Sequence, residues 1–227
     1  MNSCDRFSEL IAAVERADSA AQLFEATRAL ATAMASHGRE YPGELPPQTA
    51  LSCLVRILGF NNPGAAVAAV EGLIACGPAA VAPLLDGLDA QNYGARAWAV
   101  RALAGIGDVR GLDLLESALA DDIGPSVRRA AAIGLGTLQV AALPPPHRRH
   151  IQERALQALE GGRHDGEWVV RYAVATAIER LAFRLEGLEE ERPRAFEILQ
   201  SLADATKEGV PVVRLRAKLA LSRFPSP

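Results

Sequence analysis

An aromatic ring and a cation lie three residues apart at Trp98 and Arg101, inside the Ala-rich stretch GARAWAVRALAGIG, residues 94–107. Residues three apart on a helix are neighbours, so the indole and the guanidinium would share one face of that helix. Such a pair suits a flat, conjugated, anionic ligand, and it equally suits a hot spot for a protein partner. Tyr93 and Arg96 precede the pair and offer the same two kinds of chemistry. We therefore expect these four residues to bind a ligand or a partner; the structural alternative is that Trp98 packs under a neighbouring loop or helix.

A second group of the same kind follows later in the chain. Trp168 and Tyr172 flank Arg171 in the segment WVVRYAVATAIERL, residues 168–181. We expect these three residues also to contact a ligand or a partner. The structural alternative is stronger for Trp168, because an aromatic residue at the start of a repeat helix often packs locally.

Basic residues gather in LPPPHRRHIQ, residues 143–152, where His147, Arg148 and Arg149 would lie at the start of a helix. A helix N-terminus carries a partial positive charge and unpaired backbone N–H groups, which favour an anion such as a carboxylate. We expect these three residues to be possible anion contacts. The structural alternative is a solvated linker.

Residues for covalent or metal catalysis form no motif that we recognise. The three cysteines include no CxxC pair, and the four histidines do not pair with Asp and Ser or Cys at a known spacing. We expect no metal site, and the catalytic residues stay unknown. Asp89 is a weak candidate for an acid, whereas Asp108 is better placed to cap the next helix.

The elements that must position these residues are repeated helix pairs. Several segments share an Arg seven residues before an aliphatic residue, and a fainter copy has Ala66 in place of the Arg. Gly, Pro, Asn and Asp cluster at the turns between helices. Successive copies are spaced by 30, 32, 43 and 43 residues, which is typical of HEAT repeats. The segments that carry the Arg are 94–107, 125–138, 168–181 and 212–224.

The pattern predicts an all-α fold: one α-solenoid over residues 1–227, with about six HEAT-like helix pairs whose second helices line a concave face. Residues 139–149, QVAALPPPHRR, are interpreted as an insertion because three successive prolines break a helix. The charged segment GLEEERPR, residues 187–194, is interpreted as a loop between repeats. The predicted pairs span roughly residues 5–38, 43–77, 78–107, 108–138, 147–184 and 192–224.

The period of the helix, about 100° per residue, assigns faces to the segment 94–107. Trp98 and Arg101 point away from the apolar stripe that faces the core, and the small residues Ala102 and Gly105 would continue that open face.

The recurring Arg has a structural explanation as well. Asp122 and Asp165 lie in turns, six residues before Arg128 and Arg171. A ladder of Asp–Arg pairs could therefore link one turn to the next repeat, with Arg214 as a further member.

Composition excludes several classes of protein. The 227 residues are 49% hydrophobic, 22% charged and only 5% aromatic, as in a folded protein with an aliphatic core. A net charge of −3 argues against binding to nucleic acid, and hence against a HEAT-like DNA-repair protein, because phosphate binding needs a basic face. No apolar run reaches the roughly 20 residues of a membrane span, and the start, MNSCDRFSEL, does not resemble a signal peptide. We expect a cytoplasmic protein with no membrane insertion.

The same segments resemble a known family. The runs NNPGAAVAAVEGLIACG, LDAQNYGARAWAVRALAGIGD, SVRRAAAIGLGTL and EWVVRYAVA are similar to the E/F-type phycobilin lyases of cyanobacteria, which are HEAT-repeat proteins, and within them to the F (beta) subunits of phycocyanobilin lyase. The resemblance covers residues from about 10 to 181, and the run around NYGARAWA is its most specific part.

This resemblance implies one subunit of a heterodimeric enzyme, active only with a related E-type subunit. The pair would attach phycocyanobilin, or a related open-chain tetrapyrrole, to a cysteine of the phycocyanin alpha subunit through a thioether. The bilin would be a substrate, and no cofactor would be permanently bound. The nucleophile would belong to the acceptor protein, so that this chain would contribute mainly positioning.

A second function stays open alongside the lyase subunit. Composition and periodicity alone favour a non-catalytic HEAT-repeat adaptor or chaperone that binds a protein partner without any pigment.

Overall fold

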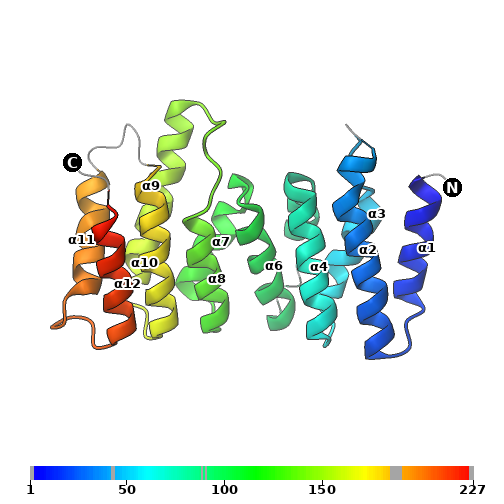
Figure 1. The fold of residues 1–227 in the computed structure, drawn as a ribbon, viewed down its shortest axis with the longest axis horizontal. Coiled ribbons are helices and arrows are strands. Elements are labelled where there is room, and N and C mark those ends of the chain that lie inside the picture. The colour runs from blue at the N-terminus through cyan, green and yellow to red at the C-terminus, as the bar shows by residue number, and fades with distance from the viewer. Residues whose placement is uncertain (1–2, 42–43, 88, 90, 185–190, 225–227) are drawn as a thin grey trace. The chain divides into compact units, whose positions relative to one another are not determined.

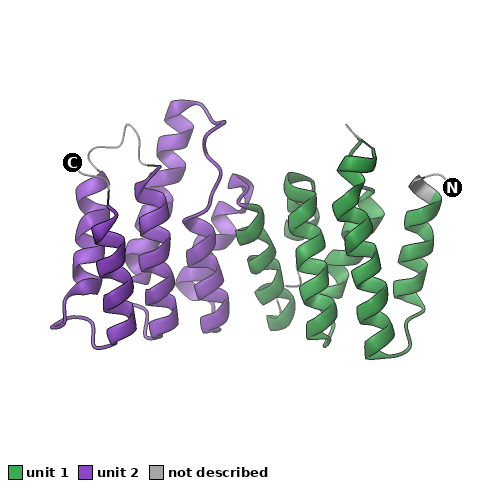
Figure 2. Ribbon diagram, viewed as in Figure 1, with its two compact units in different colours: residues 1–106 green, residues 107–227 purple. Residues whose placement is uncertain are grey.

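The computed structural model describes residues 3–41, 44–87, 89, 91–184 and 191–224. Within these ranges all regular structure is helical (Figure 1). The helices form two compact units, residues 1–106 and residues 107–227 (Figure 2). Each unit is a stack of helical hairpins, in which an odd-numbered helix is followed by its even-numbered partner.

Unit 1 contains the first six α-helices and one short 3-10 helix, Gly77–Ala80, among its described residues. The hairpins pair α1 with α2, α3 with α4 and α5 with α6. The bounds are α1 Ser3–Glu15, α2 Ala20–Glu40, α3 Gln48–Ile57, α4 Pro63–Cys76, α5 Val81–Asp86 and α6 Tyr93–Ile106.

Unit 2 begins with a 3-10 turn, Val109–Gly111, and repeats the same arrangement. Its hairpins pair α7 with α8, α9 with α10 and α11 with α12. The bounds are α7 Leu112–Asp121, α8 Pro125–Leu135, α9 Pro145–Gly162, α10 Trp168–Ala182, α11 Glu191–Ala203 and α12 Pro211–Ser222.

Neighbouring hairpins stack like helix on like helix. In unit 1, α2 packs on α4 and α4 on α6; in unit 2, α8 packs on α10 and α10 on α12. The odd-numbered helices form a second row, in which α7 packs on α9 and α9 on α11. A single hairpin cannot bury its apolar stripe alone, so the core of each unit lies between hairpins. The fully buried leucines include Leu30, Leu54, Leu73 and Leu103 in unit 1, and Leu115, Leu135, Leu156 and Leu159 in unit 2.

Small residues let the even-numbered helices approach closely. A Cβ atom added to Gly72 on α4 would lie 2.8 Å from the Cβ of Ala31 on α2. A Cβ atom added to Gly136, at the end of α8, would lie 2.6 Å from the Cα of Ala177 on α10. Glycine is therefore required at these two positions by the contact between helices.

Two asparagines fix the starts of α4 and α6. The side-chain oxygen of Asn62 accepts a hydrogen bond from the backbone three residues on (3.1 Å), and its amide donates to the carbonyl of Ala20 (2.8 Å). Asn92 caps α6 in the same way (3.0 Å) and donates to the carbonyl of Gly59 (3.1 Å). Because each amide uses its acceptor and its donor, each cap also ties its helix to the preceding part of unit 1.

The structure confirms the all-α, HEAT-like fold, and Ser19 caps α2 after the break that separates it from α1. That the pairs form one domain stays a prediction. The predicted insertion at 139–149 is too long, because α9 begins at Pro145. Proline is tolerated in the first turn of a helix, where the N–H groups have no partner within the helix. The loop at 187–194 was also wrong from Glu191, where α11 begins, and its residues 187–190 lie outside the described residues.

One segment of the described chain, residues 63–86, is long and apolar enough to cross a membrane, which corrects the expectation that no segment reaches that length. In the structure it is α4 and α5 joined through the 3-10 helix, and half of its apolar 18-residue window is buried inside the fold. This is weak evidence for a membrane span, because core helices pass the same test.

Replacing Gly136 with Ala is expected to lower the free energy of unfolding by about 1–3 kcal/mol, because the added methyl group overlaps the backbone of α10. Chemical denaturation followed by circular dichroism measures this. The matched control is Gly161→Ala on α9, where an added Cβ meets nothing within 4 Å; it should leave stability unchanged or raise it by up to about 1 kcal/mol. Equal stabilities for the two variants would contradict the close contact between α8 and α10.

Candidate functional site

The first turn of α6 is held in place by the turn before it. The carboxylate of Asp89 accepts hydrogen bonds from the backbone N–H groups of Gln91 (2.9 Å) and Asn92 (3.3 Å). Asn92 in turn caps α6. These contacts assign Asp89 to the turn, so we do not carry it forward as an acid.

Four side chains of α6 form the surface that we call the α6 surface: Tyr93, Arg96, Trp98 and Arg101. The guanidinium of Arg101 lies over the Trp98 ring, 5.6 Å from its centroid, and that of Arg96 lies 5.7 Å from the centroid of Tyr93. The structure therefore brings together both predicted aromatic–cation pairs. Tyr93 is 44% exposed, Arg101 is exposed, and Trp98 is only partly buried.

The charge of Arg101 is the chemical feature of this surface. Among the described residues, no hydrogen bond or ion pair engages its guanidinium, which lies over the face of the Trp98 ring. An indole with a cation over its face can contact a flat conjugated ligand through its ring edge. The guanidinium can at the same time form a bidentate pair with a carboxylate of that ligand.

The open face of α6 is smaller than the sequence predicted. Gly105 is exposed as expected, but Ala102 is completely buried. The reason is the number of helices that pack on α6: both α4 and α5 contact it, so that more of its circumference is covered than a single apolar stripe would require.

The Trp168 group divides into two kinds of residue. Trp168 is 45% exposed at the first position of α10, and Tyr172 is partly buried one turn later. Their predicted role in binding stays a prediction. Arg171, between them, belongs to a structural network instead.

That network is an arginine ladder, made of Arg128, Asp165, Arg171, Glu208 and Arg214. Arg128 donates to both carboxylate oxygens of Asp165 (2.6 and 3.0 Å), and Arg171 donates to both of Glu208 (2.6 and 2.9 Å). Each Arg also donates to the carbonyl of the residue six positions before it, including Arg214 to Glu208 (2.8 Å). The ladder thus links each turn of unit 2 to the next, as the sequence predicted. We therefore leave Arg171 out of the candidate binding surface.

The ladder shifts the titration of its two acids. The hydrogen bonds from Arg171 hold the pKa of Glu208 below its ordinary value. Burial would raise the pKa of Asp165, but the hydrogen bonds from Arg128 and from the backbone of Glu167 outweigh it, so this pKa is also lowered. Glu208 lies six residues before Arg214, as the two aspartates precede their arginines, so this spacing in the sequence also identifies the glutamate as a member of the ladder.

The three predicted anion contacts at the start of α9 do not act alike. His147 is exposed, and Arg149 donates to Glu153 (2.6 Å) one turn later. Arg148 turns back and donates to the carbonyls of Ala141 (3.1 Å) and Leu143 (3.2 Å). The helix N-terminus itself is a poor anion site, because prolines without N–H groups occupy its first two positions.

Other chemistry in the described part of the chain is structural. No three His, Cys, Asp or Glu side chains among the described residues gather as metal ligands. Cys53 is buried, and burial raises the pKa of the Cys76 thiol to about 11, which disfavours the reactive thiolate. Asp108 caps the 3-10 turn after α6, as expected, and it also pairs with Arg110.

Comparisons with known proteins agree with this architecture. A model of HEAT repeats matches residues 66–136 and residues 81–179. The chain is 50% identical over 182 residues to a phycocyanobilin lyase subunit beta of Pseudanabaena tenuis (80% of this chain, 60% of that protein). It is 45% identical over 201 residues to the phycocyanin alpha phycocyanobilin lyase CpcF of Synechocystis sp. (88% of this chain, 87% of that protein).

A solved structure is similar as well. In the complex of CpcE and CpcF of phycocyanin lyase from Nostoc sp. PCC7120, one chain matches with a TM-score of 0.69 and 38% identity, over 77% of this chain and 99% of that one.

The fold and the repeat match together define a HEAT-repeat protein. Its similarity to the relatives above is closer than a shared fold requires, because it includes sequence identity over most of the chain. The chain belongs to the family of phycocyanobilin lyase beta subunits. It spans 60% of the length of the first relative and 87% of the second.

The ladder predicts how stability depends on pH. Because the pKa of Glu208 is lower in the folded state, its carboxylate stabilises the fold fully above its ordinary pKa of 4.5, and this contribution is lost as pH falls through the lowered value. Glu208→Gln should lower the free energy of unfolding by about 2 kcal/mol at pH 7, and the difference from the parent should shrink below pH 4. Denaturant unfolding at several pH values measures both.

The matched control for this prediction is Glu25→Gln, which removes an exposed pair with Arg28 (2.6 Å) on α2. It should change stability by less than about 0.5 kcal/mol. A Glu208→Gln variant as stable as this control at pH 7 would contradict the ladder.

Proposed function

We propose that this chain is the beta-type subunit of a heterodimeric bilin lyase. With an E-type subunit, it positions phycocyanobilin, or a related open-chain tetrapyrrole, for attachment to a cysteine of the phycocyanin alpha subunit. Membership of the family supports this proposal, and the named relatives include a phycocyanin alpha phycocyanobilin lyase and a complex of two subunits. We propose that this attachment reaction takes place in the cytoplasm.

The observation that carries the proposal is the α6 surface. Arg101 is exposed, lies over the Trp98 ring at 5.6 Å, and has no acidic partner among the described residues. A bilin is planar and conjugated and carries two propionates. The conjugated rings of the bilin can contact the indole of Trp98, and a propionate can pair with the guanidinium of Arg101.

The chemistry assigns the nucleophile to the acceptor protein. The acceptor thiolate adds to the ethylidene carbon of the tetrapyrrole, a C–S bond forms, and the tetrapyrrole takes up a proton. This chain then needs no nucleophile and no resident cofactor, and the bilin is its substrate. Its contribution is to hold the bilin so that one carbon meets the sulfur, which converts a bimolecular encounter into a positioned reaction.

A protein-binding function is the second candidate, and one observation favours it. The last helix, α12, exposes Val212, Leu215 and Leu219 at helical spacing, with exposed fractions of 42%, 66% and 43%. An exposed apolar stripe is typical of a protein interaction surface. A HEAT-repeat adaptor would use such a stripe without handling pigment, whereas a lyase subunit could use it for its partner.

The test replaces both residues of the pair, Trp98→Ala with Arg101→Ala. Co-expression with an E-type subunit, a bilin-producing pathway and apo-phycocyanin alpha should give at least about tenfold less coloured acceptor, because losing about 1.4 kcal/mol of positioning is a tenfold effect. Zinc-stained gels and absorbance measure the attached bilin. Circular dichroism should show unchanged helix content.

The matched control is Arg39→Ala with Leu45→Ala, which removes an exposed cation and an exposed apolar side chain elsewhere in unit 1. It should transfer bilin like the parent. A colourless acceptor with the unmodified chain would defeat the lyase function. A double variant that loses thermal stability in proportion to its activity would show that Trp98 and Arg101 act structurally.

A further inference from the structure

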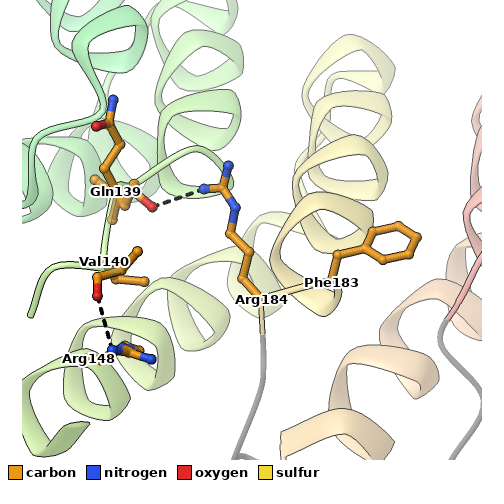
Figure 3. A pocket seen from close by; sticks show the side chains of 7 residues that line it. Gln139, Val140, Arg148, Phe183 and Arg184 are labelled. Carbon is orange, nitrogen blue, oxygen red and sulfur yellow. Dashed lines mark hydrogen bonds between the residues drawn. The ribbon is translucent and has the colours of Figure 1, made fainter.

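A cavity of about 380 Å³ lies in unit 2, among the segment after α8, the first turns of α9 and the end of α10. Leu138 and Val140, both nearly buried, and Ala141 form its apolar lining. Arg148 enters from α9, and Arg184 enters from just after α10 (Figure 3). The cavity joins elements of two hairpins of the same unit, and the function proposed above does not use it.

The two arginines are held by carbonyls and not by acids. Arg184 extends toward the segment at Gln139 and donates to the carbonyl of Leu138 (3.0 Å), as Figure 3 shows. Arg148 donates to the carbonyls of Ala141 and Leu143. A carbonyl fixes the direction of a guanidinium but leaves its charge uncompensated. The guanidinium groups are therefore set in place before any ligand arrives.

Among the described residues that line the cavity the charge balance is positive. None of them is an Asp or a Glu, whereas two are arginines. Nε of Arg148 is buried and has no acceptor, whereas Arg184 is exposed and, among the described residues, uses only Nη1, toward Leu138. Buried donors normally have a partner, and a cation is stabilised by an anion. A ligand with a negative group would provide both.

The apolar part of the lining selects the kind of anion. A small inorganic ion would leave the exposed side chains of Ala141 and Phe183 uncovered, whereas a carboxylate attached to an apolar frame would cover them. A volume of 380 Å³ lies at the lower end of the range for ligand pockets, about 300–1,000 Å³. It would hold a carboxylate arm with the ring that bears it, and the rest of a long ligand would extend out of the cavity.

We propose that this cavity binds a carboxylate carried on an apolar frame, and that in the lyase it holds one propionate arm of the tetrapyrrole. The second part rests on the proposed function. The cavity then fixes one end of the bilin through its charge, and Arg184 is a positioning residue that sets which end of the molecule is held.

The experiment measures binding of phycocyanobilin, and of its dimethyl ester, to the heterodimer with the E-type subunit. Absorbance and induced circular dichroism report the bound bilin. The unmodified heterodimer should bind the free acid more tightly than the ester. Arg184→Gln should weaken binding of the free acid about tenfold and leave binding of the ester unchanged, because only the free acid carries the charge that Arg184 pairs with.

The matched control is Arg180→Gln, an exposed arginine one turn earlier on α10 that does not line the cavity. It should bind both compounds like the parent. Arg148→Gln is the second variant, with the same expected selectivity. The comparison of acid with ester on the unmodified heterodimer does not depend on how any variant folds.

Each outcome decides a different point. Equal binding of acid and ester by the parent, or unchanged binding by Arg184→Gln and Arg148→Gln, overturns the carboxylate site. If those variants bind normally while the Trp98 and Arg101 variant loses transfer, the lyase function stands and the cavity inference fails. Competition by inorganic phosphate at the cavity would show a general anion site and overturn the assignment to a carboxylate on an apolar frame. If the parent heterodimer binds no phycocyanobilin, the proposed function and the propionate assignment both fail.

Discussion

Each unit depends on the contact between successive even-numbered helices. No hairpin buries its apolar stripe alone, so the free energy of burial becomes available only when the next hairpin stacks on it. Close approach at Gly72 and Gly136 makes that stacking dense, because any larger side chain would hold the helix backbones apart. The aromatic content of 5% fits this constraint: a core built from Ala and Leu allows closely spaced helices.

Polar contacts fix the position of each hairpin relative to its neighbour within a unit. Unit 1 uses Asn62 and Asn92, whose amides cap one helix and reach a carbonyl of the preceding part of the unit. Unit 2 uses Arg171 and Glu208, which are 37 residues apart, and their equivalents. Ionic contacts of this kind are mostly buried, with the Glu208 side chain 3% exposed. Their contribution lies in geometry as well as energy, since a guanidinium that binds both oxygens of a carboxylate tolerates little displacement.

Once stacking is secured, equivalent positions on different helices can take different roles. The position of Trp98 on α6 corresponds to Ala173 on α10 and to Arg216 on α12. Ala173 is buried, and Arg216 pairs with Glu179 of α10 and donates to Thr176 (2.9 Å). The same place in the repeat thus serves packing, an ion pair or an exposed indole. Function in such a protein is read from individual substitutions within a repeat whose framework is constant.

The sequence by itself determined what depends on neighbours along one helix: the helix pairs, the cap at Asp108, and the contact of Arg101 with Trp98. Such relations follow from the fixed rotation of about 100° per residue. The tertiary structure alone decided what depends on packing against other helices. Packing buries Ala102 and pairs Arg171 with Glu208. It also places Arg148 in the lining of the same cavity as Arg184. The spacing of residues along one helix cannot show which side of that helix its neighbours will cover.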